Sequence, residues 1–289
     1  MKTVLNFCVI TILGIALATF SFADANITLS DAIAQGKVKV EMLPYGKDGW
    51  NAIQVNVKNI SGVKIKIVMP KGTLFVPDDD GEQTLVTSGD EVFALNAGQE
   101  KLIARKGFCT EYHDHVSNAE STFTVGFSKN QKLLNLIGYI DSLGIDDKDM
   151  VQYSVWAITD DNPVGYICYE ADTVKQRLVR QRACVLTGQK MPWYNTESNI
   201  VISPQREFHI EPVEITGEIV INSDVPITFQ GVVKDANGKV LYTNPHQSHA
   251  PDGETTFDYT LHVEGWEKGT YYVVYTCNGK EVINREFQL

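Results

Sequence analysis

The chain has 289 residues, of which 43% are hydrophobic and 21% charged, and its formal net charge is −11 at pH 7. This is the composition of a folded protein, and the acidic balance argues against nucleic acid as a partner. After a short apolar run at the N-terminus, no segment approaches the roughly 18–20 apolar residues that a spanning helix needs, so no membrane span is expected.

The first residues have the pattern of a secretory signal peptide. Lys2 supplies a positive charge, residues 4–18 are almost uniformly apolar, and Ser21 and Ala23 are small residues at the positions read during cleavage. We therefore predict a signal peptide over residues 1–23 and a mature protein that is secreted or held at the outer cell surface. The remaining length suits two domains, each of about 100–200 residues.

Cysteines are too sparse for a disulfide scaffold, because only four follow the predicted signal peptide: Cys109, Cys168, Cys184 and Cys277. If residues 169–186 form one helix, Cys168 and Cys184 lie about 24 Å apart, whereas bridged cysteines have Cα atoms near 6 Å. We expect that these two do not pair with each other.

The first domain begins with short strands in which apolar and polar residues alternate. The pattern predicts strands with one wet face over residues 37–42, 53–57 and 63–67, followed by further short strands over 72–76, 83–87, 91–95 and 101–105. This spacing is typical of a sandwich or a barrel-like sheet.

Three helices should follow these strands. Leu133, Leu136 and Ile140 mark a buried helix that Gly144 ends, and Asp146 and Asp149 resemble the acidic start of a second helix. In the second helix the apolar stripe is Val151, Val155 and Ile158, with Gln152 and Trp156 on a neighbouring face.

The third helix is predicted over residues 169–186, with Gly188 as its C-terminal stop. It carries four basic residues that could form a basic patch. In so acidic a chain, we interpret them instead as a solvated helix face: Lys175, Arg177, Arg180 and Arg182.

A polar segment over residues 196–206 is predicted to link this domain to a second, all-β domain over 207–289. About seven short alternating strands predict an immunoglobulin-like sandwich there, with Asn237-Gly238 and Asn278-Gly279 at tight hairpins. The predicted fold class is thus β-rich, with an α+β domain over 24–195, made of a β-sandwich or barrel-like sheet and about three helices, before the sandwich.

Several segments of the second domain match a known secretion module. They are Ile221 to Pro226, Lys234 to Val240, Lys268 to Val273 and Asn278 to Ile283. With these segments the domain resembles the C-terminal sorting domain of the Bacteroidetes type IX secretion system. The resemblance implies a secreted or surface-attached protein that meets secretion machinery, with the sandwich either removed at the outer membrane or retained.

Two short motifs of the first domain match a family of bacterial surface adhesins. Phe108-Cys109-Thr110 is an aromatic-Cys segment, and Val151 to Trp156 has the order apolar-Gln-x-x-apolar-Trp. With them, residues 72–194 are similar to thioester domains. The resemblance implies that Cys109 is the nucleophile, that Gln152 is the acyl donor, and that their thioester captures an amine or hydroxyl on a target surface.

That chemistry requires both side chains to be in contact in a dry pocket, which Trp156 could wall. The alternative is that Cys109 is a core thiol or half of a disulfide while Gln152 satisfies buried backbone groups. Both alternatives are open at the level of the sequence.

A third hypothesis rests on the segment that follows Cys109. His113 and His115, two residues apart, would face the same way on a strand and could bind zinc or copper with Glu111. A polar loop is the competing interpretation, and no metal or other cofactor is predicted.

No nucleophile elbow, phosphate loop or zincin helix is found, so an enzyme is not expected. The leading hypothesis is a non-enzymatic surface protein that binds or adheres to an unknown ligand. Covalent adhesion through Cys109 and Gln152 is the first alternative, and an exported metal-binding protein or enzyme centred on Glu111, His113 and His115 is the second.

Overall fold

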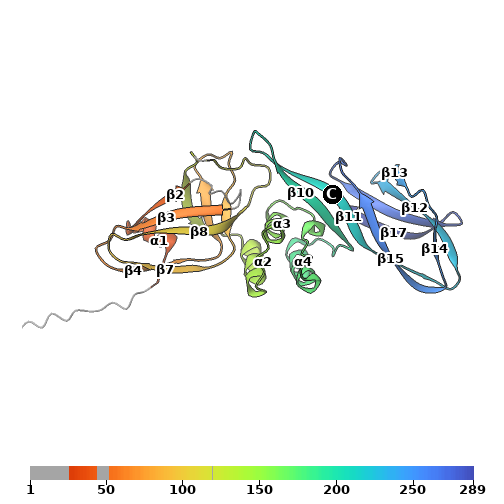
Figure 1. The fold of residues 1–289 in the computed structure, drawn as a ribbon, viewed down its shortest axis with the longest axis horizontal. Coiled ribbons are helices and arrows are strands. Elements are labelled where there is room, and N and C mark those ends of the chain that lie inside the picture. The colour runs from red at the N-terminus through yellow and green to blue at the C-terminus, as the bar shows by residue number, and fades with distance from the viewer. Residues whose placement is uncertain (1–25, 44–51, 119) are drawn as a thin grey trace, which may run out of the picture.

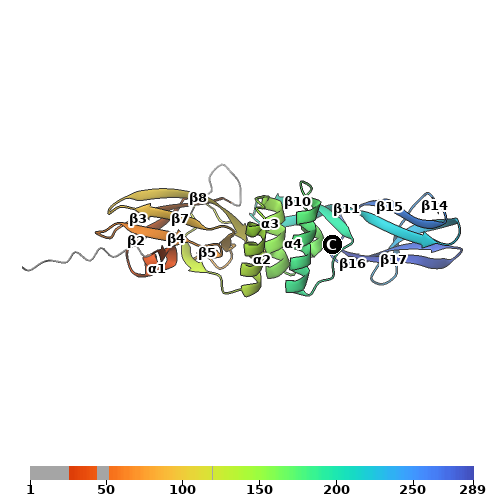
Figure 2. The same ribbon diagram turned by 90° about the horizontal axis from the view of Figure 1, so that it is seen from below.

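The computed structural model describes residues 26–43, 52–118 and 120–289. The molecule is elongated, with β-structure at both ends and helices α2, α3 and α4 between them (Figures 1 and 2). The predicted signal peptide lies outside the described residues. The fold class predicted from the sequence, a β-rich chain with helices in its N-terminal part, is confirmed.

Two sheets and four helices build the first hydrophobic core. A six-stranded sheet has the order β2-β3-β8-β6-β5-β9, and a three-stranded sheet has the order β1-β4-β7. The bounds are β1 Ile27–Thr28, β2 Val38–Leu43, β3 Ala52–Asn59, β4 Ile65–Met69, β5 Thr73–Pro77, β6 Leu85–Thr87, β7 Glu91–Leu95, β8 Glu100–Cys109 and β9 Phe123–Phe127.

Strand β8 changes partners along its length. Its first part pairs with β3 as far as Lys106, opposite Ala52, and its last three residues pair with β6 on the other side, where Cys109 lies opposite Leu85. Thr110 continues this second pairing, because its N–H donates to Thr84 O. Described residues of β3 thus pair with β8 only as far as Lys106.

The helices are α1 Leu29–Ala34, α2 Gln131–Ser142, α3 Lys148–Thr159 and α4 Thr173–Thr187, and the 3₁₀ turn η1 covers Val164–Tyr166. The side chain of Asp147 caps α3 by accepting from Met150 N at 2.8 Å. Helix α4 starts four residues later than predicted, because Asp172 provides its N-cap, and it ends at Gly188, whose φ of +85° suits glycine.

Arg180 departs from the prediction of a solvated basic face. It is only 4% exposed, and its guanidinium donates to the carbonyls of Ile167, Tyr194 and Gly165 at 2.7–3.0 Å. Burial lowers the pKa of this group, as expected when a cation loses water. Arg180 thus fastens the segment after η1 to α4 and β10.

The second core lies between two further sheets, β10-β11-β15 and β13-β12-β16-β17, with β14 paired to β12. Their bounds are β10 Tyr194–Ile202, β11 Phe208–Ser223, β12 Ile227–Asp235, β13 Val240–Thr243, β14 Ser248–Ala250, β15 Gly253–His262, β16 Thr270–Cys277 and β17 Lys280–Gln288. Asn278 and Gly279 both have positive φ, 50° and 74°, as a tight hairpin between β16 and β17 requires.

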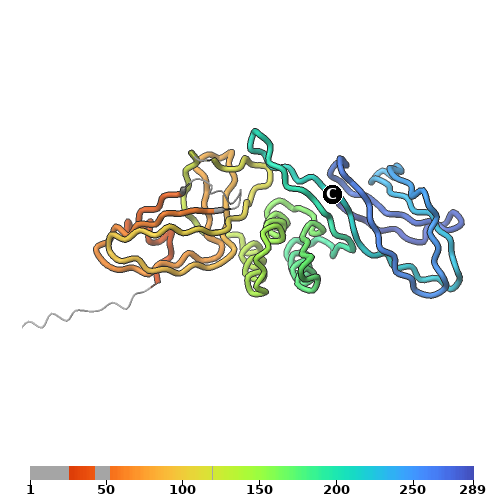
Figure 3. Tube along the Cα trace, in the orientation of Figure 1, coloured from red at the N-terminus to blue at the C-terminus, as the bar shows by residue number. Residues whose placement is uncertain are grey.

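The segment predicted as a linker is mostly strand. Residues 196–202 belong to β10, which pairs with β11 over its whole length. The polar composition of the segment suggested a loop, but the strand is at a sheet edge, where polar residues are tolerated. Figure 3 follows this hairpin from the helices into the C-terminal sheets.

Both cores receive residues from this hairpin, since Phe208 and Ile210 belong to the first core and Tyr194 and Ile215 to the second. Its tip is fixed to the first core by Arg206, whose guanidinium contacts Glu82 Oε1 at 2.8 Å and Val116 O at 3.0 Å. The connection between the two cores is therefore a pair of strands and not a loop.

All four cysteines in the described residues are free thiols. None of the described helices is long and apolar enough to cross a membrane.

Candidate functional site

The end of β8 and helix α3 run side by side in the same direction. Three contacts join them in order along the chain. Lys106 Nζ donates to Asp146 Oδ1 at 2.8 Å, Cys109 bonds Gln152, and Tyr112 N donates to Asp160 Oδ1 at 3.1 Å. The two motifs that were 43 residues apart in the sequence thus meet at the middle of this seam.

Cys109 and Gln152 are joined by a reciprocal pair of hydrogen bonds. Cys109 N donates to Gln152 Oε1 at 3.0 Å, and Gln152 Nε2 donates to Cys109 O at 2.9 Å. Both residues have an exposed fraction of 0%. The carboxamide of Gln152 therefore bonds the backbone of β8 at Cys109 as a neighbouring strand would.

The Cys109 thiol is neutral in this setting. Burial raises its pKa well above the ordinary value, and the negative charge of Glu111 adds to the rise. A cysteine that reacts with solutes from solvent is usually a partly exposed thiolate. Any chemistry of the Cys109 thiol is therefore confined to buried groups near it, and the Gln152 carboxamide is bonded to the backbone of the same residue.

Trp156, one helical turn after Gln152, lies in an aromatic cluster beside this pair. It is fully buried, and its ring meets those of Tyr112, Tyr153 and Phe208 edge-on at 5.4–5.8 Å between centroids. Phe208 is the first residue of β11. The aromatic cluster therefore ties α3 to the hairpin that leads to the second core.

Tyr112 is a site residue that the sequence analysis did not identify. Its hydroxyl accepts from Ile210 N at 3.0 Å, and the ammonium of Lys268 lies 4.2 Å from its ring centroid. Lys268 comes from the loop before β16, so Tyr112 touches elements of both cores. The available sequence signal was its position three residues after Cys109, an aromatic residue in a short polar stretch.

The three weak candidates for a metal site are held by separate neighbours. The Glu111 carboxylate accepts from Thr84 N and from Thr110 Oγ1, both at 2.7 Å. His115 Nδ1 lies 3.2 Å from Gly81 O, whereas the His113 ring meets Tyr112 edge-on at 4.6 Å.

Burial raises the pKa of Glu111. Among the described residues, no group of three His, Cys, Asp or Glu side chains is placed to hold a metal ion. The structure therefore gives no support to the hypothesis centred on Glu111, His113 and His115.

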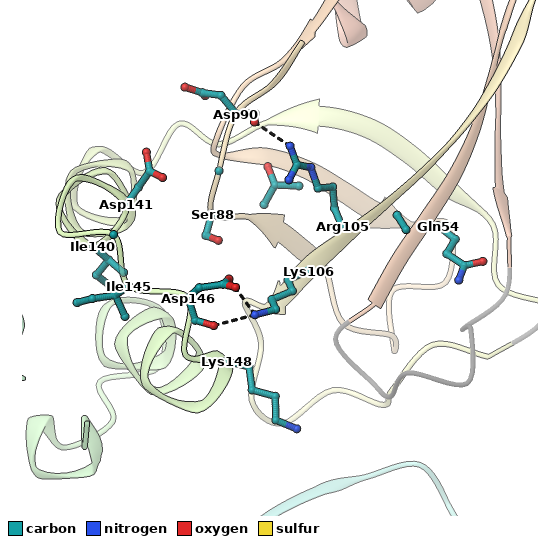
Figure 4. Close-up of a pocket in the computed structure, with 14 residues that line it drawn as sticks. Gln54, Ser88, Asp90, Arg105, Lys106, Ile140, Asp141, Ile145, Asp146 and Lys148 are labelled. Atoms are coloured by element: carbon teal, nitrogen blue, oxygen red, sulfur yellow. Dashed lines mark hydrogen bonds and ion pairs between the residues drawn. The ribbon is translucent and has the colours of Figure 1, made fainter. Parts of the chain in front are cut away.

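A cleft of about 700 Å³ opens between β8, the turn before β7 and the connection from α2 to α3 (Figure 4). Its carboxylates are already neutralised by basic side chains. Asp141 and Asp90 pair with Lys71, and Asp146 pairs with Lys106. Among the charged residues that line this cleft, only Lys148 forms no ion pair with a described residue.

The sequence matches no protein-family model and no curated protein. Among solved structures, it is similar to a transglutaminase from red sea bream, at 8% identity and a TM-score of 0.20, over 89% of this chain and 32% of the other. It is also similar to a β-glucosidase from Kluyveromyces marxianus, at 9% identity and a TM-score of 0.21, over 85% and 45% of the two chains.

The chain thus spans less than half the length of either protein. Likeness at this level carries no argument about fold or activity.

Proposed function

We propose that this chain is an exported, non-enzymatic adhesion protein whose Cys109 and Gln152 form an internal thioester for covalent attachment to a surface ligand. The observation that supports this most is the reciprocal hydrogen-bond pair, which holds the Gln152 carboxamide on Cys109 inside a dry core. The pair brings together two motifs that lie 43 residues apart in the sequence.

Thioester formation exchanges one bond for another without an oxidant. Cys109 Sγ attacks Gln152 Cδ, the Cδ–Nε2 bond breaks, and the thiol proton leaves with Nε2 as ammonia. The Cys109 N–H already donates to Oε1, so it can stabilise the negative charge that develops on this oxygen in the tetrahedral intermediate. No net charge is created, which fits a buried thiol whose pKa is raised.

The same surroundings would preserve the product. A thioester is hydrolysed if water reaches it, and here the pair is buried beside the aromatic cluster of Trp156, Tyr112 and Phe208. Attack by an amine or hydroxyl of the ligand would release the Cys109 thiol and leave the ligand bonded to Gln152 Cδ. Each molecule reacts once, so the process is attachment and not turnover.

The test is the intact mass of the protein purified without reductant. The expected result is a deficit of one ammonia that disappears in Cys109→Ala and in Gln152→Ala, and that methylamine converts into a net gain of one CH2, because the amine adds to Gln152 Cδ. Cys277→Ala is the matched control, because it removes a cysteine of the second core and should keep the deficit. A full mass in the unmodified protein would contradict the thioester and leave Gln152 as a structural partner of buried backbone groups.

In that case the remaining proposal is a surface protein that binds its ligand without a covalent bond. Export by the signal peptide, and delivery through a sorting domain of the type IX kind, belong to both versions. They predict a mature N-terminus at Asp24, which N-terminal sequencing of the secreted protein checks. Retention of residues 207–289 in the same sample would show whether the sandwich remains attached after secretion.

A further inference from the structure

A second cleft, of about 650 Å³, lies on the side of α3 that carries Tyr153. It is bounded by the start of α3, the segment after η1 and the first half of β10. Three tyrosines line it, namely Tyr153, Tyr166 and Tyr169. It shares Lys148 with the cleft of Figure 4 but none of that cleft's other lining residues.

The carboxylates of this cleft are unmatched, in contrast to those of the cleft in Figure 4. Asp149, Glu170 and Glu197 line it, and none of them forms an ion pair with a described residue. Asp147 also lines it but is engaged as the N-cap of α3. With one lysine against these groups, the cleft has an excess of negative charge.

A buried hydroxyl in the same cleft also has no partner. Thr196 lines the cleft, is 2% exposed, and its Oγ1 makes no hydrogen bond to any described residue. Such groups are usually satisfied by water or ligand. Nearby, Tyr153 and Ser198 share a hydrogen bond of 2.7 Å, which supplies two more hydroxyls that could turn to a ligand.

Strand β10 forms one wall and is the edge strand of its sheet. Its inner edge pairs with β11. Over residues 197–201 no described residue bonds the backbone of its outer edge. An edge of this kind can pair with an extended peptide, whose side chains then enter neighbouring pockets.

We propose that this cleft binds the cationic side chain of a basic peptide segment that lies along β10. The carboxylates would attract the ammonium or guanidinium group of the peptide side chain. The tyrosine rings would contact this cationic group and the aliphatic part of the same side chain, and Thr196 would accept one hydrogen bond from it. This site is separate from Cys109 and Gln152, and it does not depend on the thioester.

The test is titration of the full chain with acetyl-Lys-Lys-Lys-amide, followed by calorimetry and by the amide NMR signals of residues 147–149 and 168–171. Saturable binding is expected, and the affinity should fall at least about tenfold, or about 1.4 kcal/mol, in Glu170→Gln/Glu197→Gln. Both residues are exposed, so this variant should fold normally. The Cys109→Ala variant should bind the peptide as the unmodified protein does, whether or not a thioester forms.

The matched control is Glu218→Gln/Glu254→Gln, which changes the net charge by the same amount at exposed positions of β11 and β15. This variant should keep the affinity for the lysine peptide within about twofold of the unmodified protein. An equal loss in both variants would mean attraction to the acidic surface in general and would overturn the proposal. The proposal would also be overturned if binding of the lysine peptide did not saturate. The same holds if acetyl-Gln-Gln-Gln-amide or methyl α-glucoside bound more strongly than the lysine peptide.

Discussion

Gln152 uses its side chain as a neighbouring strand would use its backbone. Its amide donates to one peptide oxygen and accepts from one peptide N–H, both of Cys109, at a fully buried position. Gln189 makes a similar pair with Val164 N and Asn162 O, at 2.9 and 3.0 Å, but is only half-buried. The two glutamines therefore allow the effect of burial to be separated from that of hydrogen bonding.

Replacing Gln152 by leucine should destabilise the fold far more than replacing Gln189. In a Cys109→Ala background, where no thioester can form, Gln152→Leu leaves two buried backbone groups unpaired and should lower the free energy of unfolding by about 2–4 kcal/mol. Gln189→Leu should cost about 1 kcal/mol, because water can replace the lost partner. Urea unfolding measures both, and similar losses would contradict the assignment of Gln152 to a dry site.

Tyr153 gives a prediction about alkaline pH. Burial raises its pKa from the ordinary value of 10 to about 12. Below pH 10 the phenol is neutral in both states and has no effect, whereas between pH 10 and 12 it ionises only in the unfolded chain, so stability falls as pH rises. Tyr153→Phe should remove about 1 kcal/mol of the loss between pH 8 and 11.

Because Tyr153→Phe also loses the bond to Ser198, the slope is the informative quantity and not the stability at one pH.

At the scale of elements, the sequence predicted most strands and the three longer helices, since alternation and helical periodicity depend on local order. It missed α1, which has six residues, and β9, whose residues are mostly half-buried and give no clear alternation. For the candidate site, the motifs identified Cys109 and Gln152. The hydrogen bonds between them could not be predicted, because they depend on how α3 packs against the end of β8, 43 residues away in the sequence.

Arg180 shows how charge composition can mislead. It is one of four basic residues on α4 in an acidic chain, so composition placed it in solvent, yet the carbonyls of Gly165, Ile167 and Tyr194 accept from its guanidinium. These carbonyls become acceptors only once η1 and β10 are folded against the helix. The carbonyls that need a cation are therefore brought to Arg180 by the tertiary structure, and the sequence around Arg180 gives no sign of them.

Arg180→Leu should lower the free energy of unfolding by about 3–5 kcal/mol, because three buried carbonyls lose their donor. Arg182→Leu is the control on the same helix. Its Nε donates to Asn135 Oδ1 at the surface, and its loss should cost at most about 1 kcal/mol. Thermal unfolding followed by circular dichroism distinguishes the two, and a mild effect of Arg180→Leu would mean that water replaces the guanidinium.

At the scale of the whole molecule, the hairpin of β10 and β11 belongs to both cores. The second core contains Tyr194, whose hydroxyl accepts from Gln288 N at 2.9 Å, and Trp193 donates to Glu286 O at 2.7 Å. A unit cut at residue 207 would therefore lose the strand that covers β11 and both of these contacts with β17.

A fragment of residues 193–289 should thus melt cooperatively, whereas a fragment of 207–289 should melt at lower temperature and associate through the uncovered edge of β11. Calorimetry and size-exclusion chromatography of the two fragments test this. Equal melting temperatures would show that β10 contributes nothing to the sandwich.

The shared hairpin also determines how the molecule would carry a load. A ligand held at Gln152 would load the start of the sixteen-residue strand β11 through Trp156 and Phe208. An anchor at the C-terminus would load the middle of β11, because Gln288 is bonded to Tyr194, which pairs with Gly217 (Figure 1). Between these two points tension would act along the paired strands β10 and β11, so that many backbone hydrogen bonds resist together instead of opening one after another.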